Sequence, residues 1–124
     1  MLDKAIGLKY CGESPQVYQR ILNMFATLRP QKQQLMADAM AQGEWEVYIS
    51  GVHALKTNVR NIGGSVLDEK ALALEMAGKK YVDPDATDEE KRQTMDFIQS
   101  HHQEAMELYD KLAEEASKLA QELA

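Results

Sequence analysis

Residues 51–75, GVHALKTNVRNIGGSVLDEKALALE, place a histidine inside a segment with helical periodicity and follow it with a Gly-Gly pair. At about 100° per residue, one arc of this segment is apolar, which predicts a helix over about residues 44–62 with one buried face. The residues on that arc are Trp45, Tyr48, Ile49, Val52, Leu55, Val59 and Ile62. Gly63-Gly64 ends or bends the helix, and residues 66–79 show the periodicity of a further helix.

Two shorter helical segments precede this region. Ser14-Pro15 combines an N-cap with a proline in the first turn and predicts a helix over about residues 15–28, interrupted by Pro30. Residues 31–42 have high helix propensity and stop at Gly43. The chain before the central segment is therefore expected to be helical, with a break at the proline.

The C-terminal third is expected to hold the longest helix. Residues 81–86 indicate a loop, and Thr87 with Glu90 forms a capping-box pattern. From there, apolar residues alternate by three and four to about residue 121, and the alanine- and glutamate-rich end can extend past the bundle as a free helix or linker. No segment predicts a strand, so we expect an antiparallel helical bundle forming a single domain over residues 1–124.

The amino-acid composition limits which classes of function the chain can have. The chain has 14 basic and 20 acidic residues and a pI near 5.0, so it lacks the basic patch that a nucleic-acid or anionic-membrane surface needs. Cys11 is the only cysteine, which fits a reduced protein without a disulfide framework. No apolar run approaches the roughly 20 residues that span a bilayer, and no signal-peptide pattern is present. We expect a soluble, cytoplasmic protein that binds neither nucleic acid nor membrane.

The position of His53 on its predicted helix makes it a candidate for chemistry. It falls about 100° from Val52, at the rim of the apolar arc, with Lys56 at roughly 40° and Arg60 at roughly 80°. A satisfied core histidine is the usual explanation of a lone helical histidine, and snorkelling is the usual explanation of two such cations. Together, however, the cations disfavour a protonated ring and favour an anion placed on it. A phosphoryl acceptor needs this combination of a neutral ring nitrogen and nearby positive charge.

The same segment resembles the H-x-L-K-G-(x)n-G pattern of histidine-containing phosphotransfer (HPt) domains. The matching residues are His53, Ala54, Leu55, Lys56, Asn58, Ile62, Gly63 and Gly64. The preceding IGLKYCGESPQVYQRILNMF is similar to the family's first helices, and the following LALEMA is similar to its next helix. The resemblance covers about residues 2–115. It implies an all-α antiparallel four-helix bundle with a short additional N-terminal helix and a long C-terminal helix.

The resemblance also implies a role in a two-component phosphorelay. His53 would accept a phosphoryl group from the aspartyl phosphate of one response regulator receiver domain and pass it to another. Lys56 would steady the phosphohistidine, and Arg60 would add electrostatic support. Hybrid or sensor histidine kinases would be further partners.

Receiver approach is expected on a surface beside the histidine. The residues that the resemblance assigns to it are Thr57, Ile62, Gly63, Gly64 and apolar residues of the 15–41 region. Thr57 departs from the family pattern, which usually has glycine there, so its branched side chain either narrows the approach or adds a hydroxyl to the phosphate site. We expect Thr57→Gly to tighten receiver binding or leave it unchanged, and Lys56→Ala to slow transfer without disturbing the fold.

The chain would act as a monomeric, stoichiometric carrier rather than an enzyme. No Gly-rich phosphate loop or other nucleotide site is present in the sequence, so a kinase, including one in a parent hybrid sensor kinase, would supply the phosphoryl group from ATP. The carrier would need no cofactor of its own, because Mg²⁺ would belong to the receiver.

Two other interpretations remain. The bundle or its C-terminal seam could serve only to dock a partner or to dimerise. The chain could also be a fragment of a histidine kinase core, although Ala54 stands where the kinase dimerisation helix has an acidic residue after its histidine. A zinc site at His101-His102 is disfavoured, because adjacent helical residues point about 100° apart.

Overall fold

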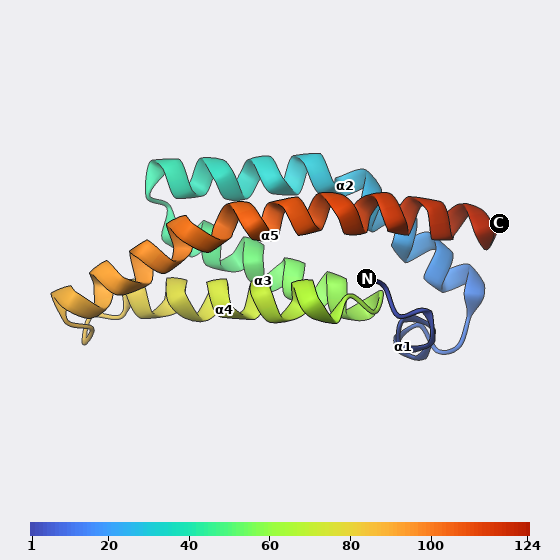
Figure 1. The fold of residues 1–124 in the computed structure, drawn as a ribbon, viewed down its shortest axis with the longest axis horizontal. Coiled ribbons are helices and arrows are strands. Elements are labelled where there is room, and N and C mark those ends of the chain that lie inside the picture. Colours follow the sequence, from blue (N-terminus) through green and yellow to red (C-terminus); the bar gives the residue numbers. More distant parts are fainter.

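The computed structural model describes residues 1–124 and is all-α, with five helices and no strand (Figure 1). The helices are α1 (Lys4–Tyr10), α2 (Pro15–Gln42), α3 (Trp45–Asn61), α4 (Ser65–Val82) and α5 (Asp88–Glu122). The all-α prediction is confirmed. None of the five helices combines the length and the apolar character that crossing a bilayer requires.

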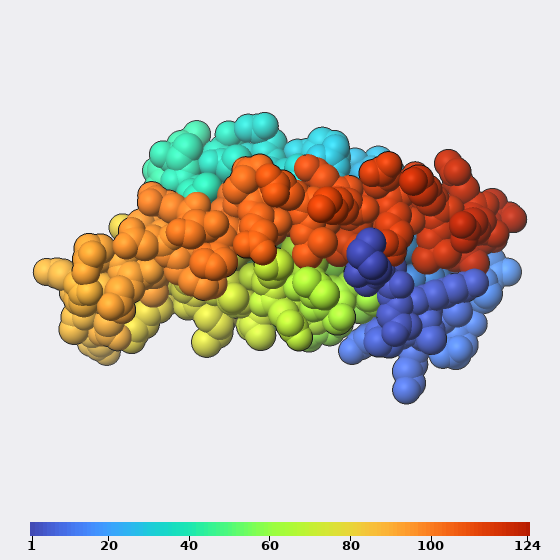
Figure 2. Space-filling model, in the orientation of Figure 1, coloured from blue at the N-terminus to red at the C-terminus, as the bar shows by residue number.

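The four long helices run side by side in alternating directions (Figure 1). Helix α3 packs against α2 and α4, and α5 packs against the same two helices from the other side. Helix α1 covers one end, where it contacts α2 and α3. Figure 2 shows α5 extending along the whole length of one face of the molecule.

The helix that contains Pro30 is continuous, which differs from the predicted break. Helix α2 extends from Pro15 to Gln42 with Pro30 inside it, although a proline has no N–H for the bond to the carbonyl one turn before. Figure 1 shows α2 changing direction between its two halves. Buried residues on both sides of the proline hold the helix to the core, and they are Tyr18, Leu22, Phe25, Met36 and Ala39. Tertiary packing therefore outweighs the local cost of the proline, which is about 3 kcal/mol.

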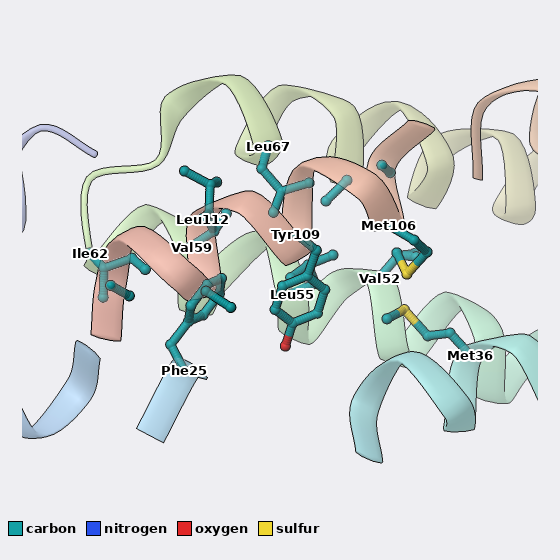
Figure 3. Close-up of a cluster of buried hydrophobic side chains, with 14 of the residues drawn as sticks. Phe25, Met36, Val52, Leu55, Val59, Ile62, Leu67, Met106, Tyr109 and Leu112 are labelled. Carbon is teal, nitrogen blue, oxygen red and sulfur yellow. The ribbon is translucent and has the colours of Figure 1, made fainter. Parts of the chain in front are cut away.

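One apolar core joins the four long helices. Figure 3 shows side chains of α2, α3, α4 and α5 pointing into a common interior, with Phe25 beside Tyr109 and Met36 facing Met106. The rings of Phe25 and Tyr109 lie 4.9 Å apart between their centroids. Burial raises the pKa of the Tyr109 phenol to about 12. This core fixes the rotation of α3 and thereby which of its residues remain exposed.

The helices begin and end at capping and turn residues that can be recognised in the sequence. Gly43 has φ 71°, the left-handed conformation that ends α2. Thr87 and Glu90 form the predicted capping box, with both reciprocal hydrogen bonds present at 3.0 and 3.1 Å. Helix α4 continues through Val82, so Tyr81 and Val82 are helical rather than part of the predicted loop.

The C-terminal end of α5 belongs to the packed structure and is not a free extension. Ala116 and Ala120 are buried against the core. The side-chain amide of Gln19 donates a hydrogen bond to the carbonyl of Ala120 at 3.0 Å, and the backbone N–H of Leu2 donates to Glu115 Oε2 at 2.6 Å. The small alanines let α5 approach the N-terminal half of α2, which explains why an alanine-rich tail packs rather than projects.

Candidate functional site

His53 lies on the exposed surface of α3, at the rim of the core as its angular position predicts. Its side chain is 58% exposed, whereas Val52 and Leu55 on either side of it are buried. The helix that carries it is held at both faces, by α2 and by α4. The imidazole is thus fixed to a rigid element and accessible from solvent.

The imidazole is hydrogen-bonded to a carboxylate of the neighbouring helix. His53 Nδ1 lies 2.7 Å from Glu75 Oε2, and Glu75 on α4 is only 2% exposed. The two helices come close together here because α4 presents small residues to α3. At Gly78, an added Cβ would lie 2.7 Å from Ile49 on α3. This close approach brings the histidine within reach of a side chain in the interhelical contact.

Two lysines complete the cluster around Glu75. Lys56 Nζ donates to Glu75 Oε1 at 2.8 Å, and Lys79 Nζ lies 3.1 Å from Glu75 Oε2. Lys56 is largely covered, with 14% of its side chain exposed, whereas Lys79 is 57% exposed. A buried carboxylate normally carries a large desolvation cost unless it is paired. Here both oxygens are paired, so the cluster is stable as an ionised unit.

The ionisation of Glu75 decides which nitrogen of His53 carries the proton. Burial is the largest single effect on this carboxyl and raises its pKa, but the hydrogen bonds from Lys56, His53 and Lys79 together outweigh it and lower the pKa to about 2. An ionised carboxylate only accepts hydrogen bonds, so Nδ1 must be the donor. In the neutral ring, the lone pair is therefore on Nε2, the nitrogen left for an incoming group.

Glu75 and Lys79 are the site residues that sequence reasoning missed. Glu75 directly follows Leu74 and is four residues after Ala71, so it is a charged residue on the buried side of α4. A carboxylate at such a position needs a partner, and this was the signal that could have identified it. Identifying the partner as His53 requires the packing of α3 on α4, which the sequence pattern does not specify.

Arg60 and Thr57 are occupied by contacts within the chain. Arg60 forms a bidentate ion pair with Asp68, at 2.9 and 3.0 Å, and this hydrogen-bonded pairing raises the pKa of the guanidinium. Thr57 is exposed one turn after His53, and its Oγ1 donates to the carbonyl of His53 at 3.3 Å. Asp68 therefore holds Arg60 away from the imidazole, while the hydroxyl of Thr57 is directed at the backbone.

Ile62, Gly63 and Gly64 lie within the chain's own packing, which differs from the exposed positions predicted for receiver contact. Ile62 is buried and its carbonyl accepts a hydrogen bond from the hydroxyl of Tyr18 at 3.0 Å. Gly63 has φ 90°, and an added Cβ would lie 2.1 Å from the carbonyl oxygen of Asp3. The turn between α3 and α4 is needed to admit the N-terminal segment, so the glycines serve an internal contact.

An apolar groove runs between α2 and α3. One hollow of about 380 Å³ includes Leu35 of α2 and Ala54 of α3, and a second of about 210 Å³ includes Met24 and Asn58. Lys32 borders both hollows. Ala54 follows His53 directly in α3, but successive helical residues point about 100° apart, so the groove lies on the α2 side of α3 while the imidazole contacts Glu75 of α4.

The other two histidines have separate environments. His101 is exposed, stacks on Phe97 with centroids 4.0 Å apart, and has Nδ1 2.8 Å from the carbonyl oxygen of Phe97. His102 is buried, with Nδ1 2.9 Å from the hydroxyl of Tyr48, and burial lowers its pKa. No group of three or more His, Cys, Asp or Glu side chains is arranged to hold a metal ion.

Comparison of the chain with protein-family models, with curated proteins and with solved structures found no match.

Proposed function

We propose that this chain is a histidine phosphotransfer domain of a two-component phosphorelay, with His53 as the phosphoacceptor. The observation that carries the proposal is an exposed imidazole whose Nδ1–H is held by the buried, ionised carboxylate of Glu75. This arrangement presents Nε2 as a nucleophile in a fixed direction. The resemblance of residues 53–64 to the HPt pattern supports the same function.

The transfer step needs only the imidazole of His53 and the aspartyl phosphate of a receiver domain. The Nε2 lone pair attacks phosphorus of an aspartyl phosphate on a receiver domain, the P–N bond forms, and the P–O bond to the aspartate breaks. The aspartate leaves as a carboxylate, while Nδ1 of His53 retains its proton. The reverse step passes the group to the aspartate of a second receiver. Mg²⁺ on the receiver would neutralise the phosphoryl oxygens during both steps.

Two cations lie within reach of the transferred group. Lys56 and Lys79 both contact Glu75, whose other contact is the ring of His53. A phosphoryl group on Nε2 adds negative charge beside them, and Lys79 is exposed enough to reorient towards its oxygens. Lys56 is the more firmly fixed of the two. Arg60 has the weaker role, because its guanidinium is engaged by Asp68.

The groove between α2 and α3 is the candidate surface for the receiver. Leu35 and Met24 are large exposed apolar residues of α2, and they border the two hollows between α2 and α3. A receiver seated there would bring its aspartate over α3, where His53 is exposed. This groove lies in the predicted 15–41 region and replaces Ile62 as the apolar contact.

The remaining parts of the proposal concern the whole chain. Helices α2 to α5 would form the antiparallel four-helix bundle of the HPt family, and their packing around one core supports this assignment. The chain would act as a monomeric, stoichiometric carrier in the cytoplasm. Receiver domains and a histidine kinase would be its partners, and ATP would enter the relay through the kinase.

The test is phosphoryl transfer from a phosphorylated receiver with Mg²⁺ present. A panel of receivers is first labelled with a small phosphodonor, the donor is removed, and the receivers are then mixed with the wild-type chain, His53→Gln or His101→Gln. We expect acid-labile, base-stable label on the wild-type chain and on His101→Gln, and none on His53→Gln. His101→Gln is the matched control, because it also removes an exposed histidine of the chain.

Absence of label with every receiver of a broad panel would contradict the carrier function. It would favour a docking module that uses the α2–α3 groove without phosphate chemistry. Label that persists on His53→Gln would place the acceptor elsewhere.

A further inference from the structure

The contact between His53 and Glu75 has a chemical consequence after phosphorylation. The charged and polar groups around the ring are Lys56 and Thr57 from α3, and Glu75 and Lys79 from α4. From α2, Lys32 borders the hollow that contains Ala54. Only Glu75 contacts a ring nitrogen, and its charge is negative.

The reactivity of an Nε2-phosphorylated imidazole depends on the proton at Nδ1. If Nδ1 is protonated, cleavage of the P–N bond returns the electron pair to Nε2 and releases a neutral imidazole. If Nδ1 is not protonated, the leaving group is an imidazolate anion, which is far more basic and leaves poorly. Loss of the Nδ1 proton therefore stores the phosphoryl group instead of passing it on.

We infer that Glu75 is a positioning residue that keeps the proton on Nδ1 of phosphorylated His53 and thereby keeps its P–N bond reactive at neutral and mildly alkaline pH. This inference rests on the proposed function and adds a determinant of how readily the carrier releases its group. The carboxylate lies 2.7 Å from Nδ1 and is buried, so solvent screens the interaction weakly. The lysines hold Glu75 ionised in the same cluster.

His101 provides an internal reference for this effect. It is also exposed, and its Nδ1 also has a hydrogen-bond acceptor, but that acceptor is the neutral carbonyl of Phe97 at 2.8 Å. Phosphorylation at Nε2 of His101 would therefore give the same chemical group with a neutral acceptor on Nδ1, although Glu104 interacts electrostatically with the same ring. The variant Glu104→Gln removes that second carboxylate, so a comparison of His53 with His101 in Glu104→Gln reports the charge of Glu75.

The experiment uses phosphoramidate, which phosphorylates an accessible imidazole with release of ammonia and needs no receiver. The full chain is labelled, the reagent is removed, and loss of each phosphohistidine is followed by ³¹P NMR between pH 5 and pH 9. His53→Gln and His101→Gln assign the signals. Glu75→Gln keeps an acceptor for Nδ1–H and removes the charge, Glu75→Asp keeps the charge, and Lys79→Gln changes the local charge without touching Nδ1.

We expect the phosphoryl group to leave His53 faster than His101 at neutral and mildly alkaline pH, since a hydrogen-bonded carboxylate favours the protonated ring. Glu75→Gln should make the phosphoryl group on His53 persist roughly tenfold longer in that pH range. Glu75→Asp should restore part of the hydrolysis rate. Lys79→Gln should not slow hydrolysis.

Coincident pH profiles for the wild type and for a folded Glu75→Gln variant would overturn the inference. If Glu75→Gln does not fold by circular dichroism, coincident hydrolysis profiles of His53 and His101 in the Glu104→Gln variant decide against it equally. Failure of phosphoramidate to label His53 would also overturn it, because an accessible Nε2 is its premise. These outcomes are independent of receiver transfer, so a chain that accepts no group from any receiver can still show or lack the effect of Glu75.

Discussion

Lys56 Nζ and Glu75 Oε1 lie 2.8 Å apart in a largely buried contact between α3 and α4. This pairing changes the interpretation of Lys56, which the sequence pattern presents as an exposed cation with little influence on stability. Because Lys56 is 14% exposed and Glu75 is 2% exposed, the lysine serves both the ion pair and the proposed transfer. Removal of either side chain leaves the other charged group buried with one hydrogen bond fewer.

Lys56→Ala should therefore slow transfer and also destabilise the fold. Glu75 would retain Lys79 and His53, so we expect a loss of about 2 kcal/mol in the free energy of unfolding, within the range for a hydrogen bond to a charged group. Urea denaturation measures it. Lys79→Ala is the control, and its cost should be under about 1 kcal/mol because Lys79 is exposed. Equal stability of the two variants would contradict the distinction drawn between them.

The stability of the fold should depend on the ionisation of Glu75 in acid. Its pKa is lowered from 4.5 to about 2 in the folded chain, so the folded state holds the carboxylate more strongly ionised than the unfolded state does. The resulting stabilisation is fully present above about pH 5 and is lost as the pH falls towards 2. The stability difference between wild type and Glu75→Gln should shrink over this range. A difference that stays constant from pH 6 to pH 3 would argue against an ionised, paired Glu75.

His102 should give a second pH dependence in a separate range. Burial lowers the pKa of its imidazole below 6.5, so the unfolded chain binds the proton more readily than the folded chain. Stability should therefore fall as the pH drops below about 6.5. His102→Gln, which can still bond to Tyr48, should flatten the urea midpoint between pH 7.5 and pH 5.5. His101→Gln, on the exposed neighbour, should leave the slope unchanged.

Gly63→Ala should destabilise the turn between α3 and α4. The new Cβ would lie 2.1 Å from the carbonyl oxygen of Asp3, and φ 90° is unfavourable for any residue with a side chain. We expect a loss of about 2 kcal/mol or more, measured as a drop in melting temperature. Gly12→Ala is the matched control, because Gly12 has φ 64° and nothing within 4 Å of its added Cβ. A similar loss in both variants would show that backbone strain, and not the contact with Asp3, accounts for the effect.

Thr57→Ala should leave transfer to His53 unchanged, since the hydroxyl is bonded to the carbonyl of His53 at 3.3 Å and not to the ring. Thr57→Gly should tighten receiver binding or leave it unchanged, at a stability cost of about 1 kcal/mol for glycine inside a helix. The dissociation constant for a receiver domain measures the effect. A clear weakening with both variants would show that the hydroxyl takes part in the complex.

The sequence by itself determined the helices and most of their ends. The capping box at Thr87, the N-cap at Ser14 and the stop at Gly43 all depend on residues a few positions apart, so they can be recognised from order alone. The exposed position of His53 follows in the same way, because one apolar stripe on α3 determines which side of that helix is buried.

Tertiary structure alone decided the partners of these residues. Pro30 lies inside α2 because buried side chains on both sides of it hold the helix to the core. Glu75 meets His53 from a position 22 residues later, across a contact set by the packing of α4 on α3. Capping and periodicity are local interactions, whereas the register of two packed helices depends on the shapes of all the side chains between them. That register pairs Nδ1 with a carboxylate and leaves Nε2 free.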